Sequence, residues 1–151
     1  MALIVHKYGG TSMGSTERIR NVAKRVAKWA RAGHQMVVVP SAMSGETNRL
    51  LGLASELAPG SAKTAYYREL DMLASTGEQA SSALLAIALQ AEGQPSVSYA
   101  GWQVAIKTND AYTKARIESI DDVRVRGDLN AGKVVIITGF QGVDENGNIT
   151  T

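Results

Sequence analysis

The chain contains no cysteine, which excludes disulfides, thiolate metal sites and cysteine nucleophiles. It has only two histidines, and because His6 and His34 lack the spacing of metal ligands, we expect them to be structural or exposed. The phosphate-binding pattern GxxxxGK followed by Ser or Thr is missing, as is the dinucleotide pattern GxGxxG. A Walker loop is therefore excluded.

A strong charge of one sign is also missing, because sixteen Lys and Arg residues against fourteen Asp and Glu residues leave a net charge of +2. So small an imbalance does not imply a nucleic-acid partner. Long apolar runs are absent too: the segment MALIVHKYGG has one short run with no positive segment before it, and no stretch reaches membrane-spanning length. We expect no signal peptide, no membrane partner and a cytoplasmic location.

What the sequence does contain is the composition of one ordinary soluble domain, with 151 residues of which 44% are hydrophobic. Apolar runs at 2–6 and 36–39 each lead into a loop of small residues, and each loop precedes a segment with helical spacing. Ser15 is expected to cap the first of these helices. The second is expected to end at the Pro-Gly pair 59–60, so the chain begins as two strand-loop-helix units.

The rest of the chain continues the alternation of helices and strands. The patterns predict helices over 62–74, 78–91 and 121–131, strands over 97–99 and 133–138, a hairpin near Lys107 and Ile117, and a tight turn at 146–147 before a terminal strand. Such alternation argues for an α/β fold with a largely parallel sheet. The last three residues look like the start of a return strand, so we expect the chain to belong to a longer product.

The first candidate site is KYGGTS, residues 7–12, where the first strand hands over to a helix. Gly9 and Gly10 let backbone N–H groups approach a phosphate, and the positive end of the helix favours an anion there. Lys7 could add a full positive charge for a transferring phosphoryl group. The alternative is a plain glycine-rich turn with a solvent-exposed lysine, and the hexapeptide alone favours that alternative.

The second candidate is SAMSGETN, residues 41–48, which follows the second strand. Its small hydroxyl residues put hydrogen-bond donors at a helix entrance, where a substrate carboxylate would be stabilised. The alternative is that Ser44 simply caps the helix with Thr47 in its first turn. The segment alone does not decide between them.

The third candidate is STGE, residues 75–78, which we expect between two helices. Its spacing is that of a capping box, in which the hydroxyl residue and Glu78 satisfy each other's backbone donors. That structural interpretation is favoured on local grounds. A substrate role for Glu78 would require its carboxylate to face the loops and pair with an ammonium group.

Five segments in order along the chain closely resemble the aspartate kinases. They are KYGGTS, VVVPSAMSGETNRLL, STGEQASSALLA, YTKARI and VVIITGFQGVDENGNITT. The resemblance implies the amino-acid-kinase fold, a three-layer α/β structure in which an open, mainly parallel sheet lies between helices on both faces. It also implies transfer of the ATP γ-phosphoryl group to the side-chain carboxylate of L-aspartate, for lysine, threonine and methionine synthesis, with Mg2+ bridging the phosphates.

The resemblance also implies roles for individual residues. The ATP phosphates would be held by Lys7, Tyr8, Gly9 and Gly10, with Ser41 beside them, and Lys7 would stabilise charge in the transition state. Thr47 would contact aspartate, and Glu78 would accept hydrogen bonds from the aspartate ammonium group. No metal-ligating side chain is implied within this chain.

The resemblance covers residues 1–151 as the N-terminal part of the kinase domain. In the family, a GRGGSD segment, the adenine pocket and regulatory domains of the ACT type come later, and the chain has none of them. We therefore expect the 151 residues alone to be inactive or nearly so, the strand over 134–137 to have an open edge, and the kinase to be a homo-oligomer. Two alternatives stay open: another amino-acid kinase acting on glutamate, acetylglutamate or a nucleotide monophosphate, or a non-catalytic binding or assembly fragment.

Overall fold

The computed structural model describes residues 1–58, 60 and 63–151. Within them the chain alternates between strands and helices, as the sequence predicts. The elements are β1 (Leu3–Tyr8), α1 (Thr16–Arg31), β2 (Gln35–Pro40), α2 (Glu46–Leu57), the 3-10 helix η1 (Lys63–Tyr66), α3 (Tyr67–Ala91), β3 (Ser96–Tyr99), β4 (Ile106–Thr108), β5 (Ile117–Ile120), α4 (Val123–Asn130), β6 (Val134–Ile137), β7 (Gly142–Val143) and β8 (Ile149–Thr150).

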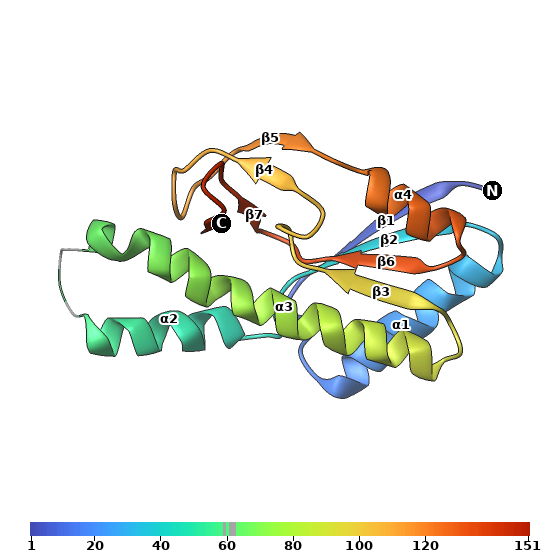
Figure 1. Ribbon diagram of the computed structural model, residues 1–151. Helices are drawn as coiled ribbons and strands as arrows, with labels where there is room; N and C mark the ends of the chain where they lie inside the picture. The colour runs from blue at the N-terminus through green and yellow to red at the C-terminus, as the bar shows by residue number, and fades with distance from the viewer. Residues whose placement is uncertain (59, 61–62) are drawn as a thin grey trace.

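The larger sheet is wholly parallel and has the strand order β1-β2-β6-β3. Helices α1 and α3 cover one face and α4 covers the other, which gives three layers (Figure 1). The predicted α/β fold is therefore confirmed. The prediction of an open edge on 134–137 is wrong, because β6 pairs with β2 on one side and with β3 on the other. The edge strands of this sheet are β1 and β3.

The core is apolar on both faces of the parallel sheet. Helix α1 places every third or fourth residue against the sheet, as an amphipathic helix does. Burying one such side chain stabilises the fold by about 1.5–3 kcal/mol. On the α1 and α3 face, the buried side chains include Ile19, Val22, Val26, Met36, Val38, Leu85, Leu89, Val134 and Ile136, and on the α4 face they include Val37, Val104, Val125, Leu129 and Val135.

The smaller sheet has the order β5-β4-β7-β8 and mixes parallel and antiparallel pairs. The predicted hairpin near Lys107 and Ile117 is confirmed as the antiparallel pair β4 and β5. The turn at 146–147 is also confirmed, since it connects the antiparallel pair β7 and β8. Figure 1 shows this sheet above the middle of α3, so the sheet and the helix face each other.

Helix α3 corrects a prediction, because it runs unbroken through 75–78, where we expected a loop. The hydroxyls of Ser75 and Thr76 donate to the carbonyls of Met72 and Leu73, at 2.8 and 2.7 Å, so they are satisfied inside the helix rather than at a cap. The capping-box interpretation of Glu78 is therefore wrong.

The helix ends correct one smaller prediction, confirm another and leave a third untested. The N-cap of α2 is Gly45, in the left-handed conformation at φ 78°, and no side chain caps the helix, so the cap predicted at Ser44 is wrong. The predicted end at Pro59 and start at Ala62 lie outside the described residues. The Ser15 cap is confirmed, because its hydroxyl accepts a hydrogen bond from the Arg18 N–H at 3.2 Å.

Candidate functional site

The β1–α1 loop and the β2–α2 loop leave the same end of the parallel sheet and touch each other. The Ser41 N–H donates to the Tyr8 carbonyl at 2.8 Å, which joins the two loops where they start. A Cβ added to Gly10 would lie 3.4 Å from the Ala42 carbonyl oxygen, so the loops remain in contact further along. Because ligands collect beyond the carboxyl ends of parallel strands, these loops form the expected place for a site.

The middle of α3 lies against these loops. The Ser81 hydroxyl donates to the Ser41 carbonyl at 2.7 Å. A Cβ on Gly77 would lie 3.0 Å from the Ala42 Cβ, a separation tighter than ordinary packing, so glycine allows α3 and the loop to approach. Glu78, the next residue, therefore reaches the same cluster from the interior of α3. Gly77 allows close packing at this point and does not end the helix.

The first turn of α2 completes the cluster. Thr47 lies in this turn and is half-buried. The neighbouring Glu46 has its Cγ 3.5 Å from the position that a Cβ on Gly77 would take, so α2 also contacts α3 here. The sequence-predicted residues in both loops, in α2 and in α3 thus lie at one end of the sheet.

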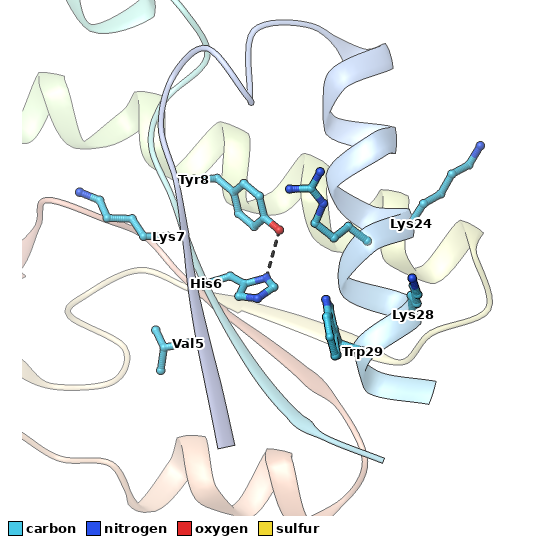
Figure 2. A pocket seen from close by; sticks show the side chains of 8 residues that line it. Val5, His6, Lys7, Tyr8, Lys24, Lys28 and Trp29 are labelled. Atoms are coloured by element: carbon cyan, nitrogen blue, oxygen red, sulfur yellow. Dashed lines mark hydrogen bonds between the residues drawn. The ribbon is translucent and has the colours of Figure 1, made fainter. Parts of the chain in front are cut away.

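Lys7 and Tyr8 point to opposite faces of the sheet, as neighbouring strand residues do. Figure 2 shows His6 and Tyr8 on the side of α1, with Val5 and Lys7 on the other side. The His6 Nδ1 and the Tyr8 hydroxyl oxygen are 3.0 Å apart, and the Tyr8 ring is buried. Lys7 is exposed and is the register partner of Val39, so its side chain shares the α4 face with Val39.

A groove of about 790 Å3 lies between β1 and α1, and Figure 2 shows the side chains that line it. It is lined by Lys24, Arg25, Lys28 and Trp29, together with residues of β1. Burial raises the pKa of the Tyr8 hydroxyl, and the charge and hydrogen bonding of Arg25 partly oppose that rise. Lys7 and Tyr8 are among the β1 residues that line this groove, although the Lys7 side chain points to the other face of the sheet (Figure 2). No described residue of the loops after β1 and β2, or of the middle of α3, lines it.

Glu78 is a buried acid, with its side chain in the cluster and only 5% of the residue exposed. Burial raises its pKa, while its own backbone N–H, the Ala42 N–H and the Gln141 side-chain amide lower it. Among the described residues no Lys, Arg or His forms an ion pair with it. Because an unpaired buried carboxylate is unfavourable, the arrangement suits a ligand that brings a positive charge.

A pocket of about 460 Å3 opens on the Lys7 face of the sheet. Its wall includes Val39 from β2 and Thr138, Phe140 and Gln141 from the segment after β6. Two polar atoms in this wall, the Thr138 hydroxyl oxygen and the Gln141 Oε1, are buried and have no hydrogen-bond partner among the described residues. Buried polar groups are normally paired, so these two atoms indicate a place for a ligand.

Thr138 and Gln141 were not predicted as site residues from the sequence. They follow the apolar strand β6, and no local motif marks them. The only signal was their presence in TGFQG, within the fifth segment of the resemblance. Their importance depends on the fold, which brings the segment after β6 against α3.

The chain belongs to the amino acid kinase family, because the model of the family described as "Amino acid kinase family" matches residues 2–151. It is 58% identical over 151 residues to the aspartokinase of Pseudomonas aeruginosa and 47% identical over 151 residues to aspartokinase 2 of Bacillus subtilis. Each comparison covers all of this chain and 36% of the relative. The resemblance to aspartate kinases is confirmed, and the chain spans about a third of the length of these relatives.

Solved structures agree with this assignment. The aspartate kinase from Synechocystis matches with a TM-score of 0.78 at 41% identity, over 99% of this chain and 24% of that one. E. coli aspartokinase III, in complex with aspartate and ADP, matches with a TM-score of 0.84 at 23% identity, over 99% of this chain and 43% of that one, which shows the shared fold. Among the described residues, no helix combines the length and apolar character needed to cross a bilayer.

Proposed function

We propose that the chain is the N-terminal part of an aspartate kinase, which transfers the γ-phosphoryl group of ATP to the side-chain carboxylate of L-aspartate. The product would be 4-phospho-L-aspartate. The observation that carries the proposal is the cluster at the end of the parallel sheet, where glycine loops beside an exposed lysine meet a buried, unpaired glutamate. The names of the similar proteins support the same activity, as does the aspartate and ADP in the E. coli structure.

The phosphate end of the site is built from Lys7 and the β1–α1 loop. No described atom lies within 4 Å of a Cβ added to Gly9, so this part of the loop is open to a ligand. Among the described residues, none accepts a hydrogen bond from the N–H groups of Gly9 or Gly10, which leaves both donors for phosphate oxygens. Tyr8 would take part through its backbone, since its ring is in the core. Ser41 lies beside this loop.

Charge neutralisation is the main task at this end. The positive charge of Lys7 would stabilise the γ-phosphoryl oxygens in the transition state, and removing one such group typically lowers the rate about a hundredfold or more. Among the described residues, no group of three or more His, Asp or Glu side chains could hold a metal ion. Mg2+ bound with the nucleotide would supply positive charge that offsets the negative charge of the phosphates.

The amino-acid end is built from Glu78 and Thr47. Glu78 would accept hydrogen bonds from the aspartate ammonium group, whose charge would pair with the buried carboxylate. Thr47 would contact the same substrate from the first turn of α2. An oxygen of the substrate carboxylate forms the new bond to the γ-phosphorus while the bond to the β-phosphate oxygen breaks, so ADP leaves and no proton moves. No covalent enzyme intermediate is needed, and catalysis rests on positioning and charge.

A coupled assay of ADP release from a full-length kinase, with these 151 residues as its N-terminal part, tests the proposal. Aspartate is expected to support turnover, whereas glutamate, acetylglutamate and a nucleotide monophosphate are not. Turnover with one of those acceptors and not with aspartate would assign the chain to another branch of the family. The 151 residues alone are expected to show little or no turnover, because the relatives are about three times as long.

A further inference from the structure

Gln141 connects the segment before β7 to the middle of α3. Its side chain is 93% buried, since only 7% of the residue is exposed. Its Nε2 donates a hydrogen bond to the Ser75 carbonyl oxygen at 3.0 Å. Ser75 lies three residues before Glu78, so the bond attaches Gln141 to the helical turn that carries the buried glutamate. The amide also lies close enough to the Glu78 carboxylate to lower its pKa.

The orientation of this amide follows from its partners. A backbone carbonyl can only accept hydrogen bonds, so the amide NH2 must face the Ser75 carbonyl. The Oε1 is left facing elsewhere, and no donor among the described residues reaches it although it is buried. An unsatisfied buried acceptor is unfavourable, so in the working enzyme a ligand donor is the natural partner for this oxygen.

The chemistry of the two acceptors selects the kind of donor. The Gln141 side chain lines the 460 Å3 pocket, and Glu78 lies beside the Gln141 amide. An ammonium group has three N–H donors and no acceptor, so it can serve the carboxylate and the amide oxygen together. A hydroxyl has a single donor and brings no charge to balance Glu78.

We propose that Gln141 is a specificity-determining residue whose Oε1 accepts a hydrogen bond from the substrate ammonium group while its NH2 holds Glu78 in position. The proposal rests on the proposed function, because it assigns a contact to the substrate of that site. It predicts that discrimination in favour of an amino acid over the same dicarboxylate without the amino group depends on Gln141.

The test compares aspartate with succinate, which lacks the ammonium group, as acceptors for full-length kinase carrying Gln141→Met. Methionine keeps the length and removes the amide. The ratio of kcat/KM for aspartate to kcat/KM for succinate is expected to fall about ten- to hundredfold, because a hydrogen bond to a charged group is lost for aspartate alone. The KM for ATP should stay within about twofold.

Gln79→Met is the matched control. Gln79 lies next to Glu78 on α3 and donates to the Ser75 hydroxyl at 3.2 Å, but it does not line the pocket. It is expected to leave the ratio unchanged. A Gln141→Met enzyme with the wild-type ratio, or an equal loss with both acceptors, overturns the proposal while the proposed function stands. A wild-type enzyme that does not phosphorylate aspartate overturns both.

A second measurement does not depend on the variant folding. In a crystal structure of the wild-type kinase with aspartate, the Gln141 Oε1 should lie about 2.7–3.2 Å from the aspartate nitrogen. An aspartate whose nitrogen contacts Glu78 and lies beyond hydrogen-bond distance of Gln141 would also overturn the proposal.

Discussion

The two sheets of this molecule both border the candidate site, but different interactions hold them. In the parallel sheet, Val38, Val135 and Ile136 are completely buried among apolar side chains. The smaller sheet has strands of two to four residues, and every residue of β5 is exposed. Specific polar contacts fix its geometry instead. The contrast teaches that the parallel sheet under the site tolerates polar substitutions poorly, whereas the smaller sheet depends on polar side chains for its geometry.

Asp71 is the main polar anchor of the smaller sheet. It is buried on α3 and accepts hydrogen bonds from the N–H groups of Thr113 and Thr151, at 3.0 and 2.8 Å, and from the Thr151 hydroxyl at 2.6 Å. Thr113 has a left-handed backbone at φ 69°, which is unfavourable for threonine. Both threonines line the 460 Å3 pocket, so the helix that carries Glu78 also holds this wall of the pocket.

The largest effect is expected from Ile136→Ala in the parallel sheet. Ile136 is fully buried, and truncating such a side chain costs about 2–5 kcal/mol through lost burial and the cavity left behind. Thermal unfolding of the full-length kinase should show a transition many degrees lower. If Ile136→Ala destabilises the protein less than Asp71→Asn does, the contrast between the two sheets is contradicted.

Asp71→Asn should have the next largest effect. The asparagine NH2 would face N–H donors in place of one carboxylate oxygen, leaving buried groups unsatisfied at a cost of about 1–3 kcal/mol. Thermal unfolding measures the loss, and the KM for aspartate should rise because the pocket wall shifts. Asp110→Asn is the control, since Asp110 is exposed and near in sequence. An Asp71→Asn protein as stable as the control would show that apolar packing alone holds this sheet.

Thr108→Val tests whether a single buried polar contact stabilises the smaller sheet. The buried hydroxyls of Thr108 and Thr150 are hydrogen-bonded to each other across the sheet. Valine keeps the shape and removes the hydroxyl, so we expect a loss of about 0.5–1.5 kcal/mol, again by thermal unfolding. Exposed Thr76, whose hydroxyl bonds only within α3, provides the matched Thr76→Val control. Equal effects at both positions would mean that the buried pair contributes nothing particular to this sheet.

The smallest stability effect is expected from Glu78→Gln, which should stabilise the protein where the preceding three variants destabilise it. Burial raises the pKa of Glu78 in the folded protein above its unfolded value, so the folded state holds the proton more tightly. Wild-type stability therefore falls as pH rises from the ordinary pKa of glutamate, about 4.3, through the raised value, and glutamine avoids this loss.

Melting temperatures measured across that pH range check the sign. The melting temperature of Glu78→Gln should rise relative to that of the wild type as pH increases through this range, and the two should be equal below it. The KM of the variant for aspartate should be higher than that of the wild type. Glu69→Gln is a suitable control on α3, because Glu69 is exposed. A difference independent of pH would show that burial does not penalise the Glu78 charge.

The sequence predicted the parallel sheet and the loops after β1 and β2 because these depend on local patterns. Apolar runs followed by glycine and hydroxyl residues lie within a few positions of each other, so periodicity and capping rules reach them. Lys7 was singled out within such a local pattern, whereas the roles of Ser41 and Thr47 came from the resemblance to aspartate kinases, and all three roles stay predictions. Each lies in or next to the loop that its motif indicated.

The remaining features depend on contacts between distant segments. Gly77 lets α3 pack closely against Ala42, which is 35 positions away in the chain. Ser75 and Thr76 look like cap residues until their hydroxyls are seen to bond within the helix. Gln141 reaches Ser75 across 66 positions, so no local pattern could mark it as part of the site.

The central claim is that the cluster around Lys7, Ser41 and Glu78 is one phosphoryl-transfer site, and the kcat of Lys7→Met in full-length kinase tests it most directly. Because Lys7 is exposed, the variant should fold as the wild type does, and kcat should fall about a hundredfold or more. Lys24→Met is the control and should keep wild-type kcat, because Lys24 lies on α1, on the side of β1 opposite to the Lys7 side chain (Figure 2). A Lys7→Met enzyme that turns over as fast as the Lys24→Met enzyme would contradict the claim.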